Sequence, residues 1–98
     1  MSRRVGFHRL ARQELKEAAH YYDSESPGLG SEFLNEIERC IQSILDYPEA
    51  APVLTAPVRR RLTQRFPYAV LYSIKPKRIR ILAIMNLKRR PMYWVGRE

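Results

Sequence analysis

The sequence predicts a two-layer α+β domain in which a helical hairpin packs on a mainly antiparallel sheet. Three observations predict this class. The length of 98 residues leaves room for one core, apolar residues recur with a helical period in the first half, and β-branched and aromatic runs mark the second half. We expect the order β-α-α-β-β-β, followed by a short C-terminal tail from Pro91. Residues 1–98 should form a single domain.

The first predicted elements are a short strand and a helix. Residues 3–7 alternate polar and apolar side chains and end in an aromatic residue, which favours a strand. From about Leu10 the apolar period becomes helical, and the Ser- and Gly-containing residues 24–30 end the helix. Glu14 is expected on or beside its solvent side. The apolar face of this helix comprises Ala11, Leu15, Ala18 and Tyr22.

A second helix is predicted after the break. Ser31 is expected to cap its N-terminus, and Pro48 ends it. Its apolar stripe comprises Phe33, Ile37, Cys40, Ile41 and Ile44. Two helices joined by a short Gly-containing turn should form an antiparallel hairpin, and its apolar face needs another layer to cover it.

The remaining chain predicts that covering layer. Residues 58–66 alternate in the manner of a strand, and residues 68–74 form a β-branched and aromatic run. Residues 75–78 supply a turn, and residues 79–87 form a second apolar run. Because both runs are almost continuously apolar, we expect central strands that are covered on both faces.

Basic residues are distributed unevenly along the chain. Its 18 Lys and Arg residues outnumber 10 Asp and Glu residues, giving a formal charge of +8. Six basic and nine acidic residues lie up to Pro57, whereas twelve basic residues and only Glu98 as an acid follow it. This asymmetry predicts one cationic face and an acidic or polyanionic partner.

The Arg-rich stretch of residues 58–65 is the strongest local signal. Strand alternation would place Arg59, Arg61 and Arg65 on one surface, where they repel each other unless an anion lies across them. The alternative is a solvated strand face that only protects the sheet edge from aggregation. Near the C-terminus, Arg89 lies close to Tyr93 and Trp94, a mixture that can hold phosphates and stack bases. Trp94 is equally well interpreted as a core anchor.

Several functional classes are excluded or disfavoured. Cys40 is the only cysteine, so neither an internal disulfide nor a CxxC zinc site can form, which fits a reducing cytoplasm. Its position on the apolar stripe predicts a buried thiol and not a reactive one. No phosphate-binding glycine loop or metal motif occurs, and we expect no cofactor and no metal. The apolar runs are too short for a membrane span. His8 and His20 receive no functional role.

An ordered set of motifs covers nearly the whole chain. It consists of Phe7-x-x-x-Ala11-x-x-Glu14-Leu15, Tyr21-Tyr22, Gly28-Leu29-Gly30-x-x-Phe33, Phe66-Pro67-Tyr68-x-Val70-x-Tyr72 and Arg89-x-Pro91-x-Tyr93-Trp94. In this set the sequence resembles the RelE/ParE superfamily, the plasmid-stabilising toxins of type II toxin–antitoxin modules. The Tyr-Tyr and Gly-Leu-Gly features are closer to the ParE-like branch. The resemblance implies the same element order that periodicity predicts.

The resemblance implies a partner and two alternative targets. Members are silenced by an acidic antitoxin, and a heterotetramer with it is one possible assembly. ParE-like members inhibit DNA gyrase by binding, whereas RelE-like members cleave mRNA on the ribosome. A third alternative is a non-toxic module that binds nucleic acid or antitoxin. The residues expected to contact a partner are Arg59, Arg61, Arg65, Arg89, Trp94 and Arg97.

The ribonuclease alternative makes separate demands on the site. Arg61, Arg65 and Arg89 would clamp the phosphate, and Tyr93 would transfer a proton. Relatives often have histidine where this chain has Asn86, which cannot exchange protons near neutral pH. We therefore favour a toxin that binds its target and is not an enzyme. Relatives also have Ser or Thr as a helix cap at the position of His8, whose presence predicts a loss of about 1 kcal/mol of capping.

Overall fold

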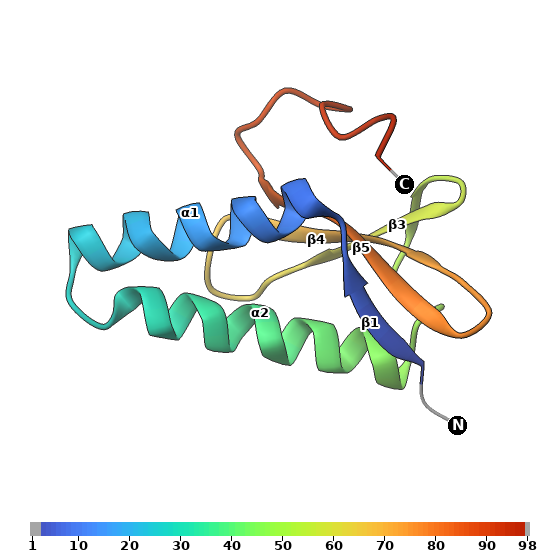
Figure 1. Cartoon of the computed structure of the whole chain (residues 1–98), viewed down its shortest axis with the longest axis horizontal. Coiled ribbons are helices and arrows are strands. Elements are labelled where there is room, and N and C mark those ends of the chain that lie inside the picture. The colour runs from blue at the N-terminus through green and yellow to red at the C-terminus, as the bar shows by residue number, and fades with distance from the viewer. Residues whose placement is uncertain (1–2, 98) are drawn as a thin grey trace.

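The computed structural model describes residues 3–97 and confirms the predicted α+β class and the β-α-α-β-β-β order (Figure 1). It adds one short strand to this order. The elements are β1 (Arg4–Phe7), α1 (Arg9–Glu25), α2 (Leu29–Asp46), β2 (Val53–Thr55), β3 (Val58–Leu62), β4 (Tyr68–Ile74) and β5 (Arg78–Asn86). The sheet order is β1-β5-β4-β3-β2, in which β1 pairs parallel to β5 and all other pairs are antiparallel.

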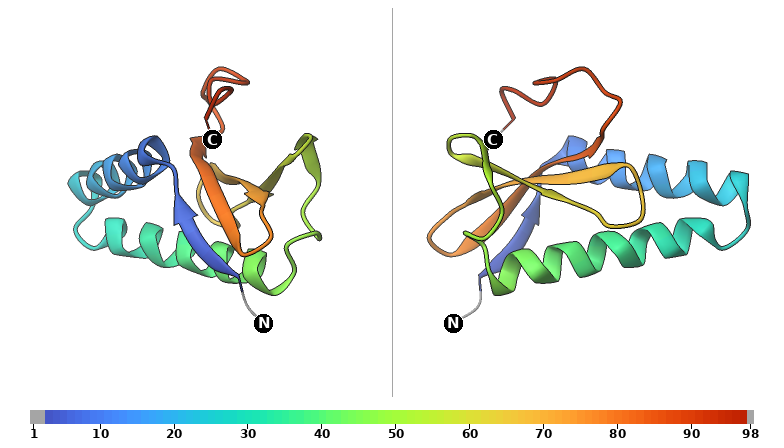
Figure 2. Two further views of the ribbon diagram at one scale, coloured as in Figure 1. Left: turned by 45° about the vertical axis from the view of Figure 1, so that its right-hand side comes forward. Right: turned by 180° about the vertical axis from the view of Figure 1, so that it is seen from behind.

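The central strands β4 and β5 are covered on both faces over much of their length, as their apolar runs predict. On the inner face, alternate residues of β4 and β5 such as Val70, Tyr72 and Ile81 pack against Phe33 and Ile37 of α2. The outer face carries a second cluster, which contains Val58, Ala69, Leu71, Leu82, Ala83, Met85 and Trp94. Residues 88–97, the C-terminal segment, supply Trp94 to this cluster. This segment lies on the far side of the molecule from α2 (Figure 2).

A β-bulge in β5 explains how side chains beyond Ile81 keep these two faces. Tyr72 pairs with Ile81, whereas the preceding Leu71 pairs with Ala83, so Leu82 is an extra residue in β5. The extra residue reverses the alternation, and Ile84 therefore returns to the inner face while Ala83 stays on the outer face.

The N-terminal capping of both helices differs from the prediction. The structure begins α2 at Leu29, so Ser31 is not its N-cap. Asp23, near the end of α1, accepts hydrogen bonds through Oδ1 from the backbone N–H of Gly28 (3.1 Å) and of Gly30 (2.8 Å). This carboxylate satisfies the donors that a capping serine would otherwise satisfy. Gly28 has φ 89°, a left-handed conformation that favours glycine.

Glycine is also required where the helices meet. A Cβ on Gly30 would lie 2.4 Å from the carbonyl oxygen of Ala19, a steric clash with backbone. The Gly28-Leu29-Gly30 motif therefore provides both the turn and the close approach of the helical hairpin.

His8 caps α1, contrary to the expectation that capping is lost. Its Nδ1 accepts a hydrogen bond from the backbone N–H of Leu10 at 3.1 Å. An imidazole nitrogen can thus replace the hydroxyl oxygen of a serine or threonine cap when it is unprotonated.

Candidate functional site

Arg59 and Arg61 lie on the helix-facing side of β3, opposite Tyr72 and Val70 of β4. The guanidinium of Arg59 donates to the carbonyl oxygens of Ala51 (2.7 Å) and Glu49 (3.0 Å). It therefore ties the segment between α2 and β2 to the sheet. Both hydrogen bonds of Arg59 are to the chain's own backbone, so this side chain has a structural role.

Arg61 lines a hollow of about 200 Å³ between α2 and β3. Glu36 and Cys40 also line it, and burial raises the pKa of the Cys40 thiol to about 11. The prediction that Cys40 is buried is confirmed, and the raised pKa favours the protonated thiol near neutral pH.

Arg65 lies outside β3, contrary to the prediction of a strand through residue 66. The strand ends at Leu62, and the hydroxyl of Thr63 donates to the carbonyl oxygens of Phe66 (2.6 Å) and Tyr68 (3.2 Å) to form a turn. Arg65 forms an ion pair with Glu32 of α2.

A second carboxylate of α2 holds the same turn. Glu36 accepts hydrogen bonds from the backbone N–H of Gln64 (2.8 Å) and from Arg39 (3.0 Å). These bonds, the backbone bond first, lower the pKa of Glu36 despite its burial. The acidic residues of α2 thus partly neutralise and fix the arginine-rich stretch.

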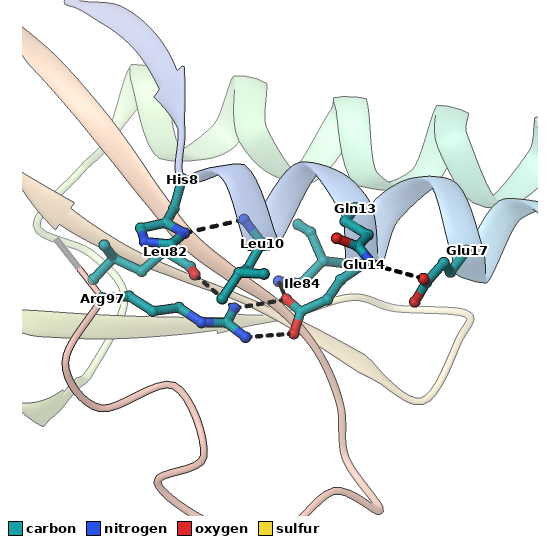
Figure 3. A network of polar contacts seen from close by, with 8 residues as sticks. All are labelled: His8, Leu10, Gln13, Glu14, Glu17, Leu82, Ile84 and Arg97. Carbon is teal, nitrogen blue, oxygen red and sulfur yellow. Dashed lines mark hydrogen bonds and ion pairs between the residues drawn. The ribbon is translucent and has the colours of Figure 1, made fainter.

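Arg97 and Glu14 form a nearly buried, two-pronged ion pair (Figure 3). The guanidinium Nη2 lies 2.9 Å from Oε2, Nη1 lies 3.0 Å from Oε1, and the side chains are only 11% and 14% exposed. Bidentate pairs of this kind are strong and geometrically specific. The expectation that Glu14 lies on or beside the solvent side is wrong, because Arg97 covers it.

The same pair completes the hydrogen bonding of β5. The pairing of β5 with β1 ends at Ile81, so the following backbone groups of β5 have no strand beside them on that side. Glu14 accepts from the backbone N–H of Ile84 at 3.0 Å, and Arg97 donates to the carbonyl oxygen of Leu82 at 3.0 Å (Figure 3). These two side chains take the place of a longer β1.

Arg89 and Arg97 both lie over the ring of Tyr93. Their guanidinium carbons are 4.2 Å and 5.0 Å from the ring centroid, within the range of cation–π attraction. The Tyr93 hydroxyl is buried and has no hydrogen-bond partner that meets ordinary geometry within residues 3–97. Burial and the neighbouring Glu14 carboxylate raise the pKa of Tyr93.

Trp94 is a core residue in this structure. It is 5% exposed and packs in the outer cluster, so its ring is not displayed for base stacking. Arg89 remains exposed and lines a second hollow of about 200 Å³, together with Glu17, Tyr21 and Asn86.

The prediction that the arginines form one cationic face is wrong. Arg59 and Arg61 share one face of β3, as strand alternation predicts, but that face lies toward the helical layer. Arg65 is paired with Glu32, and Arg97 is paired with Glu14. Helical spacing did not predict the contacts of Glu14 with Arg97 and Ile84, although its place in the Phe7-to-Leu15 motif was a signal. Within residues 3–97, no group of three His, Cys, Asp or Glu side chains is arranged to hold a metal ion. Neither described helix combines the length and apolar character that a membrane span requires.

Comparison with known proteins identifies the family. The family model described as the ParE toxin of the type II toxin–antitoxin system parDE matches residues 5–91. The chain belongs to this ParE toxin family. The match includes Glu14 and Arg89 and ends before Tyr93, Trp94 and Arg97.

A solved structure supports the fold. The chain is similar to a chain of a chromosomal ParDE toxin–antitoxin system from P. aeruginosa, with a TM-score of 0.75 and 19% sequence identity. The similarity covers 86% of this chain and 95% of that one. No curated protein sequence matches significantly. The predicted ParE-like branch of the superfamily is therefore confirmed by the family match.

Proposed function

We propose that this ParE-family protein inhibits DNA gyrase by binding it, and that an acidic antitoxin neutralises it. Family membership and the likeness to a ParDE toxin–antitoxin system support the toxin class and the antitoxin partner. The excess of basic residues after Pro57 supports an acidic partner, since complementary charge speeds encounter and favours specific association.

The residues that line the hollow at Arg89 are the observation that supports inhibition by binding. Cleavage of RNA at its 2′-hydroxyl needs one group to accept that proton and another to protonate the leaving oxygen. Asn86 does not titrate, Glu14 is held by Arg97, and the buried Tyr93 has a raised pKa. Two carboxylates line this hollow, but Glu14 is bound by Arg97 and Glu17 accepts a hydrogen bond from Gln13, so no pair of free carboxylates is available there as base and acid. This arrangement supports inhibition without hydrolysis.

Side-chain exposure divides the six proposed contact residues into two groups. Arg61, Arg65 and Arg89 have partly or fully exposed side chains and are proposed to meet carboxylates of the antitoxin. Arg59, Trp94 and Arg97 are proposed to affect binding through the fold, because their side chains are engaged within the chain.

A supercoiling assay tests the gyrase proposal. Purified protein in stoichiometric excess over purified gyrase should suppress supercoiling of relaxed plasmid, and prior mixing with the antitoxin should restore it. Mapping of transcript ends after induction in cells is the parallel measurement. Unchanged supercoiling together with new cuts inside codons would show that the ribonuclease alternative is correct.

A further inference from the structure

The outer face of the sheet is only half covered. Trp94 and Tyr93 pack over its apolar half, which includes Leu71, Ala83 and Met85. The other half lies toward the turn between β4 and β5, where Ser73 pairs with Arg80. A cavity of about 470 Å³ opens there, the hairpin cavity. It is larger than the hollows at Arg61 and Arg89.

Four cations line the hairpin cavity. Lys75 and Arg78 come from the turn and the start of β5, and both are exposed. Arg80 is half-buried and has contacts within the chain, and Arg97 is nearly buried and bound to Glu14. No carboxylate of the described residues lines it, and Val58, Leu82 and the hydroxyl-bearing Ser73 complete the wall. The lining therefore offers hydrogen-bond donors and aliphatic surface to a ligand that carries negative charge.

The pKa of His8 is lowered by burial and by the positive charges at the hairpin cavity. Burial first, and then the positive charges of Arg97 and Arg80, lower the pKa of His8. The Glu14 carboxylate acts in the opposite direction but does not reverse the shift. Arg4 adds further positive charge, because it lies beside Arg78 in the parallel pairing of β1 with β5.

We propose that the hairpin cavity binds the phosphodiester backbone of nucleic acid. Guanidinium groups match phosphate oxygens with two parallel hydrogen bonds, and aliphatic walls accept the sugar. No aromatic side chain lines the cavity, so it provides no platform for stacked bases. Contacts to the backbone alone give binding that depends on salt and not on sequence. That this backbone is the DNA held by gyrase rests on the proposed function, whereas the binding itself does not.

Fluorescence anisotropy with a short labelled DNA duplex tests the proposal without gyrase. The full chain should bind the duplex, and log Kd should rise linearly with log salt concentration. The double variant Lys75→Gln/Arg78→Gln should reduce that slope by roughly two and weaken binding on the order of tenfold at about 0.1 M salt. The matched control Lys16→Gln/Arg12→Gln removes two exposed charges from α1 and should behave like the parent.

Three outcomes would overturn the proposal: no binding of the duplex, a flat salt dependence, or an equal loss in both double variants. A short polyglutamate peptide provides the competing arm. If the peptide binds in a manner that requires Lys75 and Arg78 while the duplex does not, the hairpin cavity belongs to an acidic protein segment. Duplex binding with normal gyrase activity would uphold the cavity and reject the gyrase target instead.

Discussion

Two positively charged regions of this protein use their cations in opposite ways. In the C-terminal segment, Arg97 is nearly buried and bound at both prongs by Glu14. At the hairpin cavity, Lys75 and Arg78 are exposed, and no carboxylate of the described residues lines the wall. The first region uses charge to hold the fold together, and the second presents it to a ligand. Position relative to the few acidic residues, and not local charge density, separates the two roles.

The largest expected effect comes from removing the carboxylate of the first region. Glu14→Gln leaves the Arg97 guanidinium nearly buried without a counter-charge, so we expect a loss of about 3 kcal/mol in the free energy of unfolding. Denaturant unfolding monitored by circular dichroism measures it. Replacing both partners by methionine should cost less than Glu14→Met alone, because no unpaired charge then remains. A loss below about 1 kcal/mol for Glu14→Gln would place this pair with the weak surface pairs.

A smaller effect on stability is expected at His8, whose pKa depends on charged residues in both regions. His8→Ala should cost about 1 kcal/mol through loss of the cap of α1. The pKa of His8 is lowered in the folded state, so the unfolded chain binds the proton more readily. The stability from the neutral cap is therefore full above the ordinary histidine pKa of 6.5 and is lost as the pH falls through the folded pKa.

Unfolding measured from about pH 7.5 to about pH 5 should reveal this loss. His8→Asn keeps a capping side chain that does not titrate, and should flatten the dependence in this window. Removing a nearby positive charge by Arg80→Gln should raise the His8 pKa, as read from the imidazole proton signals in NMR. An unchanged His8 pKa in that variant would mean that the positive potential of the hairpin cavity does not reach α1.

The smallest effect on stability is expected at the second region. Lys75→Gln/Arg78→Gln changes two exposed side chains, so the free energy of unfolding should stay within about 0.5 kcal/mol of the parent. Thermal unfolding provides the measurement. A clear destabilisation would show that these cations also support the fold, and the contrast with Arg97 would then fail.

The periodicity of apolar residues was sufficient to predict the helices and the long strands, but it was insufficient to predict the contacts of the candidate site. The helical stripes and the runs of β4 and β5 are long enough for their burial to be predicted from spacing, and Phe33, Cys40 and Ile81 are buried accordingly. The three-residue β2 carries no periodic signal, and the turn at Thr63 replaces strand pairing with hydrogen bonds that alternation cannot reveal.

The pairing of charges depends on contacts between distant parts of the chain. Glu14 and Arg97 lie 83 positions apart, so helical spacing alone placed Glu14 toward solvent. Asp23 likewise replaces Ser31 at the start of α2 because the helices fold back on each other. The hairpin cavity could not be predicted from spacing for the same reason, since its cations come from the turn after β4, from β5 and from the C-terminal segment.

Glu14 and Arg97, which bond the backbone of β5 beyond the end of β1, also protect one edge of the sheet. Unpaired backbone groups on a border strand invite another polypeptide to add itself there. Beyond β1, the N–H of Ile84 and the carbonyl of Leu82 are already engaged by Glu14 and Arg97, so an incoming strand finds neither group available. At the opposite border, β2 has three residues and an irregular register. Both features reduce the length of sheet edge that another strand could pair with, and variants that break the Glu14 contact should lose solubility as well as stability.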